Sequence, residues 1–346
     1  MNREGNFYGL HRVMDERPCL PQVAKCLDPR LPIYSNEILI QVEKINVDSA
    51  SFRQMKELCG EDPHKLKEHI LTLVKYKGKL HNPVTESGGM LAGKVLEVGA
   101  GYRGPLQLSK GDFIATLVSL TLTPLVLENI HSINLHTGQL QVQGYAILFE
   151  SGIAAKIPED FSANLAVALF DVCGAPQLVH RHVQAQDKVL VMGAGKSGLL
   201  SAFAALDKVG KSASVVLADA SSRQVQVARD LGFGAVEALA DQPVDFLTRL
   251  PTRGGFNVVV NTTNKSDTEM AAILACKPRG KVLFFNMATQ FGRAVLGAEG
   301  VGADVDLLMG NGYSQGHAEY VLDLVRRNKE LRKYFEGIYA GEEKRS

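Results

Sequence analysis

The chain has 346 residues, a length that suits about two domains. Its 38 Lys and Arg residues against 37 Asp and Glu residues leave a formal net charge of +1, which argues against a protein that coats nucleic acid. With 45% hydrophobic residues and no apolar run of membrane-spanning length, the composition is that of a globular protein with a sizeable core. We therefore expect neither a nucleic-acid partner nor a membrane partner.

The five cysteines are odd in number and widely spaced, and no Cys-x-x-Cys pair occurs. This pattern supports neither a disulfide framework nor a zinc-finger site. The first residues carry charge and lack the apolar core of a secretion signal. We therefore expect a cytoplasmic protein with reduced thiols.

The first half of the chain has the pattern of a β-rich domain. Alternation of apolar and polar residues, bounded by turn residues, predicts strands over 37–43, 93–99, 112–118 and 139–143. Between them, apolar residues at helical spacing predict one helix over 62–76, which Asp62 and Pro63 would start well. Short strands with frequent turns suggest a barrel that is interrupted by this helix.

After about residue 155, strands and helices alternate. The pattern predicts helices over 158–182, 197–208, 222–231 and 314–333. Strands are expected over 188–192, 214–219, 256–261 and 281–286, the last two nearly all apolar, as in strands buried on both faces of a sheet. Such alternation predicts an α/β domain with a doubly wound parallel sheet.

A glycine-rich turn joins the first of these strands to the following helix. In the pattern Gly-x-Gly-x-x-Gly, the first glycine allows a tight turn, the second lets backbone approach a pyrophosphate, and the third lets the helix pack on the strand. An acidic residue, Asp219, ends the next strand, where a carboxylate would bind the adenosine ribose. The turn and this acid together predict a dinucleotide site that includes Gly193, Ala194, Gly195, Lys196, Ser197, Gly198 and Asp219.

The residues after Asp219 leave the choice of dinucleotide open. Asp219 favours NAD, because its carboxylate would repel a 2′-phosphate. After Ala220, the side chains of Ser221, Ser222 and Arg223 could instead hold the 2′-phosphate of NADP, or merely cap a helix and face solvent. We expect NAD, with NADP possible.

The nicotinamide half of the cofactor should lie at the ends of the later strands, since ligands of open α/β sheets bind at the carboxyl ends of strands. Four residues stand at these ends, although each could simply begin a loop. They are Asn261, Thr262, Asn286 and Met287.

Several segments carry a resemblance to the medium-chain dehydrogenase/reductase superfamily. They are the run 93–99, Lys110-Gly-Asp112, the segment 157–162 and the glycine turn. The resemblance implies a GroES-like β-barrel catalytic domain over 1–155, an inserted Rossmann domain over 156–295, and a tail, 296–346, that returns to the catalytic domain. It also implies an active site between the domains and a homodimer or homotetramer.

Two departures from the superfamily's zinc-binding members stand out. Those members carry Gly-His-Glu where this chain has Gly88, Gly89 and Met90, and a ligand cysteine where it has the segment 46–49. Zinc needs three or four ligands at fixed geometry. The chain is therefore identified as a zinc-independent member without a metal.

Within that group the chain is most similar to the L-erythro-3,5-diaminohexanoate dehydrogenase family. The similarity lies in the segments 9–13, 62–76, 171–176 and 309–317. It implies NAD(P)-dependent oxidative deamination at C3 of this small diamino acid in lysine fermentation. The products would be 5-amino-3-oxohexanoate and ammonia.

Such a reaction needs a base to take a proton from the C3 ammonium and to activate water. The resemblance places three acids near the corresponding zinc-ligand segments: Asp48, Glu86 and Asp171. Each could also be structural, as a turn residue, a solvated side chain and a helix cap, respectively.

The substrate carboxylate calls for a cation. The candidates in this chain are Arg53, Lys75 and Lys79, although a lysine-rich helix is often just a solvated face.

Other interpretations remain open. A zinc-independent quinone or enoyl reductase, or an alcohol dehydrogenase, would use the same cofactor, and a reductase of neutral substrates predicts no clustered acids at the site. A non-catalytic dinucleotide-binding protein predicts that Asp48, Glu86 and Asp171 point away from the nicotinamide.

Overall fold

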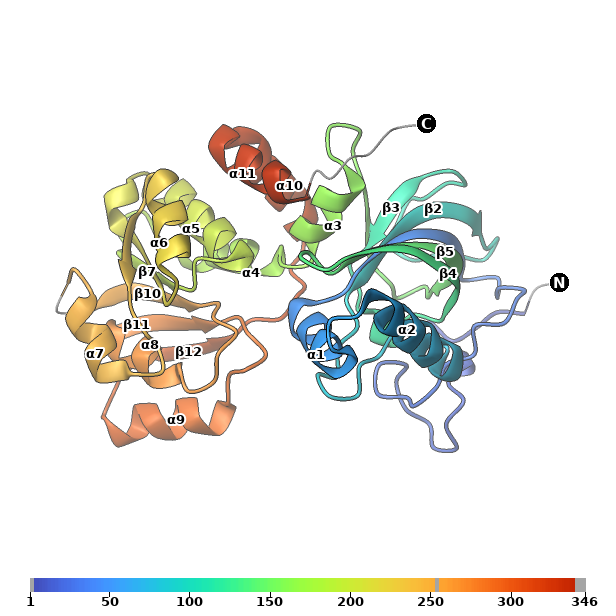
Figure 1. The fold of residues 1–346 in the computed structure, drawn as a ribbon, viewed down its shortest axis with the longest axis horizontal. Coiled ribbons are helices and arrows are strands. Elements are labelled where there is room, and N and C mark those ends of the chain that lie inside the picture. Colours follow the sequence, from blue (N-terminus) through green and yellow to red (C-terminus); the bar gives the residue numbers. More distant parts are fainter. Residues whose placement is uncertain (1–2, 253–254, 340–346) are drawn as a thin grey trace. The chain divides into compact units, whose positions relative to one another are not determined.

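The computed structural model describes residues 3–252 and 255–339, which form two compact units (Figure 1). Among the described residues, the first unit contains residues 3–171 and 335–339, and the second contains residues 172–252 and 255–334. The predicted boundaries followed residues 155 and 295. That division into domains stays a prediction; by compactness alone, residues 156–171 group with the first unit and residues 296–334 with the second.

The first unit contains an antiparallel sheet of six strands, in the order β4-β5-β1-β2-β3-β6. The strands are β1 (Ile38–Asn46), β2 (Met90–Val98), β3 (Phe113–Thr116), β4 (Leu125–Asn134), β5 (Gln139–Leu148) and β6 (Ala154–Lys156). The four strands predicted in this half are confirmed. The register of β1 shifts between Val42 and Lys44 against both neighbours, a bulge that helps the sheet to curve around its core (Figure 1).

The helices of this unit pack on that sheet. They are α1 (Ser49–Cys59), α2 (Pro63–Lys77) and α3 (Ala163–Phe170), with the short 3₁₀ turns η1 (Leu10–Arg12) and η2 (Leu120–Leu122). Helix α2 confirms the predicted helix: Asp62 Oδ1 accepts a hydrogen bond from the His64 amide at 2.8 Å, and the buried residues Leu66, Ile70 and Val74 join the core.

The second unit contains a parallel sheet of six strands, in the order β9-β8-β7-β10-β11-β12. They are β7 (Val189–Met192), β8 (Val215–Asp219), β9 (Gly234–Glu237), β10 (Phe256–Asn261), β11 (Cys276–Phe284) and β12 (Asp306–Met309). The chain moves outward from β7 through β8 and β9, then returns to the other side of β7 with β10. This is the strand order of a Rossmann domain, as predicted, and the order reverses between β7 and β10.

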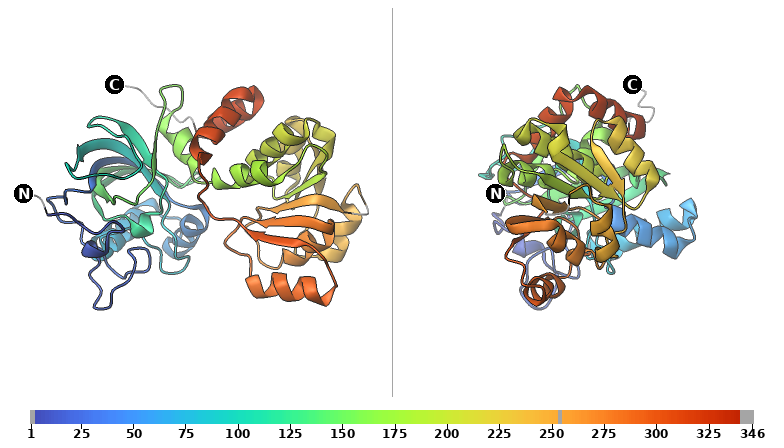
Figure 2. Two further views of the ribbon diagram at one scale, coloured as in Figure 1. Left: turned by 180° about the vertical axis from the view of Figure 1, so that it is seen from behind. Right: turned by 90° about the vertical axis from the view of Figure 1, so that its left-hand side faces the viewer.

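Helices cover both faces of this sheet, with α5 and α6 on one side and α8 and α9 on the other (Figures 1 and 2). The helices of this part of the chain are α4 (Gly174–His182), α5 (Lys196–Val209), α6 (Ser222–Asp230), α7 (Pro243–Arg249), α8 (Glu269–Ala275), α9 (Phe291–Gly300), α10 (His317–Arg327) and α11 (Lys329–Tyr339), with the 3₁₀ turn η3 (Ser212–Ser214). No helix within residues 3–252 and 255–339 has both the length and the apolar character needed to cross a bilayer.

Two predicted helices are each divided in the structure. The stretch 158–182 forms α3 and α4, separated by a turn over residues 171–173. The stretch 314–333 forms α10 and the first part of α11, separated at Asn328, whose backbone is not helical (φ −108°, ψ 88°). The Asn328 side chain donates to the Leu324 carbonyl oxygen at 2.7 Å, which satisfies an acceptor at the end of α10.

Candidate functional site

The glycine turn lies between β7 and α5, at the point where the strand order reverses. Gly193 has a φ of 90°, a conformation that favours glycine. A Cβ atom on Gly195, at the start of α5, would meet nothing within 4 Å, whereas one on Gly198 would lie 1.8 Å from the Gly193 carbonyl oxygen. Each glycine thus has the geometric property that its predicted role requires: a tight turn, open space before a helix N-terminus, and close packing of helix on strand.

Asp219, at the end of β8, is held by two backbone amides. Its Oδ2 accepts a hydrogen bond from the Ala194 amide at 2.7 Å, and its Oδ1 accepts one from the Ser221 amide at 2.8 Å. The first of these bonds ties the carboxylate directly to the glycine turn. Asp219 is therefore fixed beside the N-terminus of α5.

The residues after Asp219 begin helix α6. Ser221 is its N-cap, and its hydroxyl oxygen accepts from the Gln224 amide at 3.5 Å. Ala220, Ser222 and Arg223 are exposed. Ser221 thus has the capping role that was one of the two interpretations of this segment.

Two of the four predicted strand-end residues serve the fold. Asn261 is fully buried; its Nδ2 donates to the Thr268 hydroxyl at 2.8 Å, and its Oδ1 accepts from the Thr263 hydroxyl at 2.8 Å. The Thr262 hydroxyl donates to the Met192 carbonyl oxygen at 2.9 Å, which joins the ends of β10 and β7. The hydrogen bonds of both side chains therefore join parts of the fold next to the glycine turn.

The other two strand-end residues retain groups that the fold does not use. Asn286 Oδ1 accepts from the Thr289 hydroxyl at 3.0 Å, but its buried Nδ2 has no hydrogen-bond partner among the described residues. Met287 is 85% exposed. The Asn286 amide nitrogen and the Met287 side chain are thus not engaged by the described residues just beyond the end of β11.

The three predicted acids occupy different settings in the first unit. Asp48 is the N-cap of α1: its Oδ1 accepts from the Ser51 amide at 2.9 Å, while its Oδ2 is buried with no partner in the described chain. Glu86 is exposed, has a φ of 55°, and lines a pocket of about 450 Å³. Asp171 is half-buried at the C-terminus of α3. Neither Asp48 nor Asp171 lines the pocket that Glu86 lines.

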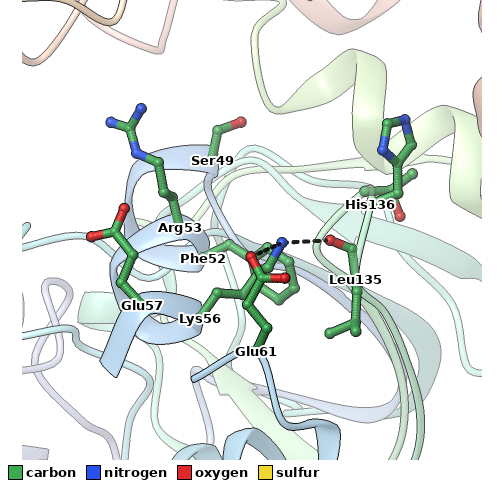
Figure 3. Close-up of a pocket in the computed structure, with 9 residues that line it drawn as sticks. Ser49, Phe52, Arg53, Lys56, Glu57, Glu61, Leu135 and His136 are labelled. Carbon is green, nitrogen blue, oxygen red and sulfur yellow. Dashed lines mark hydrogen bonds and ion pairs between the residues drawn. The ribbon is translucent and has the colours of Figure 1, made fainter. Parts of the chain in front are cut away.

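A second pocket of the first unit, of about 430 Å³, was not predicted from the sequence (Figure 3). It lies between α1 and the turn from β4 to β5, and its volume is within the range of small-molecule sites. The lining residues are Ser49, Phe52, Arg53, Lys56, Glu57, Glu61, Leu135, His136 and Thr137. The signal that could have revealed its charged wall is the spacing of Arg53, Lys56 and Glu57, three and four residues apart, which places them on one helix face.

The three candidates for binding the substrate carboxylate are separated by the structure. Lys79 is fully buried, and its Nζ donates to the carbonyl oxygens of Pro21 at 2.8 Å and Gln22 at 3.1 Å. Burial, with a smaller contribution from the charge of Lys77, lowers the pKa of Lys79 to about 8. Lys75 is exposed on α2 and lines neither pocket, so Arg53 alone of the three lines one.

The position at which zinc-binding members carry a histidine has no room for a side chain here. Gly89 has a φ of 87°, and a Cβ atom on it would lie 2.0 Å from the Asn46 carbonyl oxygen. Within the part of the chain that the structure describes, no group of three or more His, Cys, Asp or Glu residues could hold a metal ion. The close approach of β1 and β2 at Gly89 gives a physical reason for the missing ligand.

Comparison with known proteins relates the chain to one enzyme family over nearly its full length. The profile of the L-erythro-3,5-diaminohexanoate dehydrogenase N-terminal domain matches residues 11–158. The L-erythro-3,5-diaminohexanoate dehydrogenase of Acetoanaerobium sticklandii is 44% identical over 342 residues, which cover 97% of this chain and 99% of the relative. That of Fusobacterium nucleatum is 42% identical over 343 residues, with the same coverage of 97% and 99%.

Solved structures confirm the fold of Rossmann and GroES-like domains. The enoyl reductase CurK matches with a TM-score of 0.56 at 16% identity, covering 96% of this chain and 88% of that one. An alcohol dehydrogenase from Thermotoga maritima matches with a TM-score of 0.55 at 16% identity, covering 88% and 85%. Given the two full-length relatives, the chain belongs to the L-erythro-3,5-diaminohexanoate dehydrogenase family, whose fold is that of the medium-chain dehydrogenase/reductases.

Proposed function

We propose that the chain catalyses the NAD(P)-dependent oxidative deamination of L-erythro-3,5-diaminohexanoate at C3. The observation that carries this proposal is the identity of 42–44% over nearly the full length of two dehydrogenases that act on this diamino acid. In the reaction, the C3 ammonium loses a proton, C3 gives a hydride to the nicotinamide, and water hydrolyses the resulting imine. The products are 5-amino-3-oxohexanoate, ammonia and the reduced dinucleotide.

The glycine turn has the properties that a dinucleotide requires. The empty space at Gly195 admits a pyrophosphate close to backbone, and the N-terminus of α5 supplies a positive end of a helix dipole. The bound cofactor supplies the hydride acceptor. Gly193, Gly195, Gly198 and Asp219 would hold its adenosine diphosphate half, and Asn286 and Met287 would contact its nicotinamide half.

Of the three acids, we assign the proton-accepting role to Asp48. Its Oδ2 is a buried carboxylate oxygen without a hydrogen-bond partner among the described residues, and such a group gains free energy when a donor reaches it. The next residue, Ser49, lines the 430 Å³ pocket. An ammonium group of a bound substrate is the donor that would satisfy Asp48 Oδ2. Glu86 and Asp171 stay as alternative candidates.

The charged lining of that pocket supports a charged substrate over a neutral quinone or enoyl group. Two cations and two carboxylates line it: Arg53, Lys56, Glu57 and Glu61. Lys56 and Glu61 pair with each other, but a neutral substrate would displace water from Arg53 and Glu57 and offer their charges no hydrogen bonds in return. A diamino acid offers them its own carboxylate and ammonium groups.

We further propose that NAD is the preferred dinucleotide. Both carboxylate oxygens of Asp219 are engaged by backbone amides, so turning this side chain away to admit a 2′-phosphate would break two hydrogen bonds. The charge of Asp219 therefore stays where it repels that phosphate and attracts the ribose hydroxyls.

Replacing Asp219 tests this preference. We expect Asp219→Ala to raise KM for NAD by about 10- to 100-fold, since a hydrogen bond to a charged group contributes about 1.5–3 kcal/mol. In Asp219→Asn, the amide oxygen can still accept a bond while the charge is lost, so this variant should relax discrimination against NADP with a smaller loss for NAD. Steady-state kinetics with both dinucleotides measures this, and an unchanged ratio of kcat/KM values in both variants would contradict the assignment.

Self-association into a homodimer or homotetramer stays a prediction, supported by apolar side chains exposed near the β12 edge of the second sheet. Phe291 and Leu296 on α9 are 70% and 68% exposed, and Met309 at the end of β12 is 48% exposed. Large apolar side chains that are exposed on one part of a protein are typical of surfaces that another subunit covers. We expect sedimentation velocity to show an oligomer that Phe291→Glu with Leu296→Glu weakens; a wild-type monomer would contradict the prediction.

The function is tested by measuring the reduction of NAD and NADP with L-erythro-3,5-diaminohexanoate, beside lysine, β-lysine and simple alcohols. We expect reduction with the diaminohexanoate and little with the other compounds. No amine-dependent reduction with either dinucleotide would reject the proposal.

A further inference from the structure

We propose that the 430 Å³ pocket binds the two ends of the diamino acid, with Arg53 holding the C1 carboxylate and Glu57 holding the C5 ammonium. This assignment rests on the proposed function and adds the residues that select the substrate. It follows from the pairing of charges in the pocket, from the spacing of the two residues on α1, and from the groups around them (Figure 3).

Two of the four charged side chains of the pocket already pair with each other. Lys56 Nζ lies 3.3 Å from Glu61 Oε1 and donates to the Leu135 carbonyl oxygen at 3.4 Å. Lys56 and Glu61 therefore pair their opposite charges, and the bond from Lys56 to Leu135 joins α1 to the turn after β4. In contrast, Arg53 and Glu57 are exposed, and neither side chain forms an ion pair or hydrogen bond with any residue in the described ranges.

The uncommitted pair matches the charges of the substrate. Once the C3 ammonium has given up its proton, the diamino acid carries one carboxylate and one ammonium. Arg53 and Glu57 offer one guanidinium and one carboxylate. A guanidinium can bind a carboxylate through two parallel hydrogen bonds, and a carboxylate is the natural acceptor for an ammonium.

The spacing also matches. Arg53 and Glu57 are four residues apart on α1, so their Cβ atoms should be about 5–6 Å apart on one face of the helix. Four single bonds join C1 and C5 of the substrate, a separation of about 5 Å when extended. The substrate can thus lie along α1 with each end beside its partner. Figure 3 shows Arg53 and Glu57 together on α1, on the side of the helix away from Leu135, with the Lys56–Glu61 pair on the other side.

The surroundings favour this direction of binding. Ser49 is the first residue of α1, and Arg53 is one turn further along, so the proposed carboxylate site lies in the N-terminal half of the helix. Phe52, which is 6% exposed, also lines the pocket. The ammonium end lies near Glu57, towards the helix C-terminus, where cations are favoured.

Substitutions that keep size while removing charge test the assignment. We expect Arg53→Gln and Glu57→Gln each to lower kcat/KM for L-erythro-3,5-diaminohexanoate by about 10- to 100-fold, mainly through KM, because each removes one charge-assisted contact. The matched controls are Arg103→Gln and Glu97→Gln, at exposed residues of the same unit that line neither pocket. All four variants should unfold within a few degrees of the wild type.

Two competing ligands distinguish the ends of the pocket. The compound 3-aminohexanoate lacks the C5 amine, and 2,4-diaminopentane lacks the carboxylate. Arg53→Gln should weaken inhibition by 3-aminohexanoate and leave that by 2,4-diaminopentane unchanged, and Glu57→Gln should do the reverse. Equal effects on both inhibitors, or no loss of kcat/KM in either variant, would overturn the assignment. A wild-type enzyme that does not oxidise the diaminohexanoate would instead reject the proposed function itself.

Discussion

Asp48→Asn is expected to lower kcat by about 10²–10⁴, the usual contribution of a general base. The variant should keep its fold, because Asn caps helices as well as Asp does, and the bond from the Ser51 amide at the N-terminus of α1 can be retained. What it loses is the charge on Oδ2, the oxygen that has no hydrogen-bond partner among the described residues. Steady-state kinetics together with thermal unfolding separates these two effects.

The controls for this variant are the other two predicted acids. Glu86→Gln and Asp171→Asn should turn over substrate near the wild-type rate if Asp48 is the base. The acid limb in the pH profile of kcat/KM should disappear only in Asp48→Asn, an effect that a purely structural role would not produce. Wild-type turnover by Asp48→Asn, or a 100-fold loss in either control, would move the role to another residue.

Gly198→Ala should disrupt both dinucleotide binding and the second unit. The added methyl carbon would lie 1.8 Å from the Gly193 carbonyl oxygen, and backbone cannot yield as a flexible side chain does. We expect α5 to move off β7, with a loss of about 3 kcal/mol in the free energy of unfolding. This corresponds to a fall in Tm of roughly 6–12 °C, and dinucleotide affinity should drop by more than 100-fold, about 3 kcal/mol.

Substitutions at two further glycines separate the effect on dinucleotide binding from the effect on stability. A Cβ atom on Gly195 meets nothing, so Gly195→Ala should keep its Tm while losing dinucleotide affinity to a methyl group in the space proposed for the pyrophosphate. Gly292 in α9 also has open space, and Gly292→Ala should change neither affinity nor stability by more than about 1 kcal/mol. If Gly198→Ala bound NAD like the wild type, α5 would not hold the cofactor as proposed. Calorimetric titration with NAD and thermal unfolding measure both quantities.

The features that could be predicted from the sequence are those that depend on residues close together in the chain. The glycine turn, the strand before it and Asp219 lie within about one βαβ unit, so their geometry follows from local rules about turns and parallel strands. The alternating strands β1, β2, β3 and β5 were likewise found. Strand β4 was missed because its exposure does not alternate cleanly along its length.

The pocket could not be predicted because its walls are about eighty residues apart in sequence. Pairing of Asn46 with Gln139, and a hydrogen bond of 3.1 Å from the Val47 amide to the Gly138 carbonyl oxygen, bring the start of α1 beside the turn after β4. Periodicity contains no information on which strands pair. The burial of Lys79 could not be predicted for the same reason, because its acceptors, the Pro21 and Gln22 carbonyl oxygens, belong to a loop distant in sequence.

Oxidative deamination at C3 is tested most directly by following the products and the isotope of one reaction together. With L-erythro-3,5-diaminohexanoate deuterated at C3, we expect one deuterium in each reduced dinucleotide, and one ammonia and one 5-amino-3-oxohexanoate released per dinucleotide reduced. Mass spectrometry and an ammonia assay measure all three quantities. Reduced dinucleotide without deuterium, or without an equivalent of ammonia, would contradict oxidative deamination at C3.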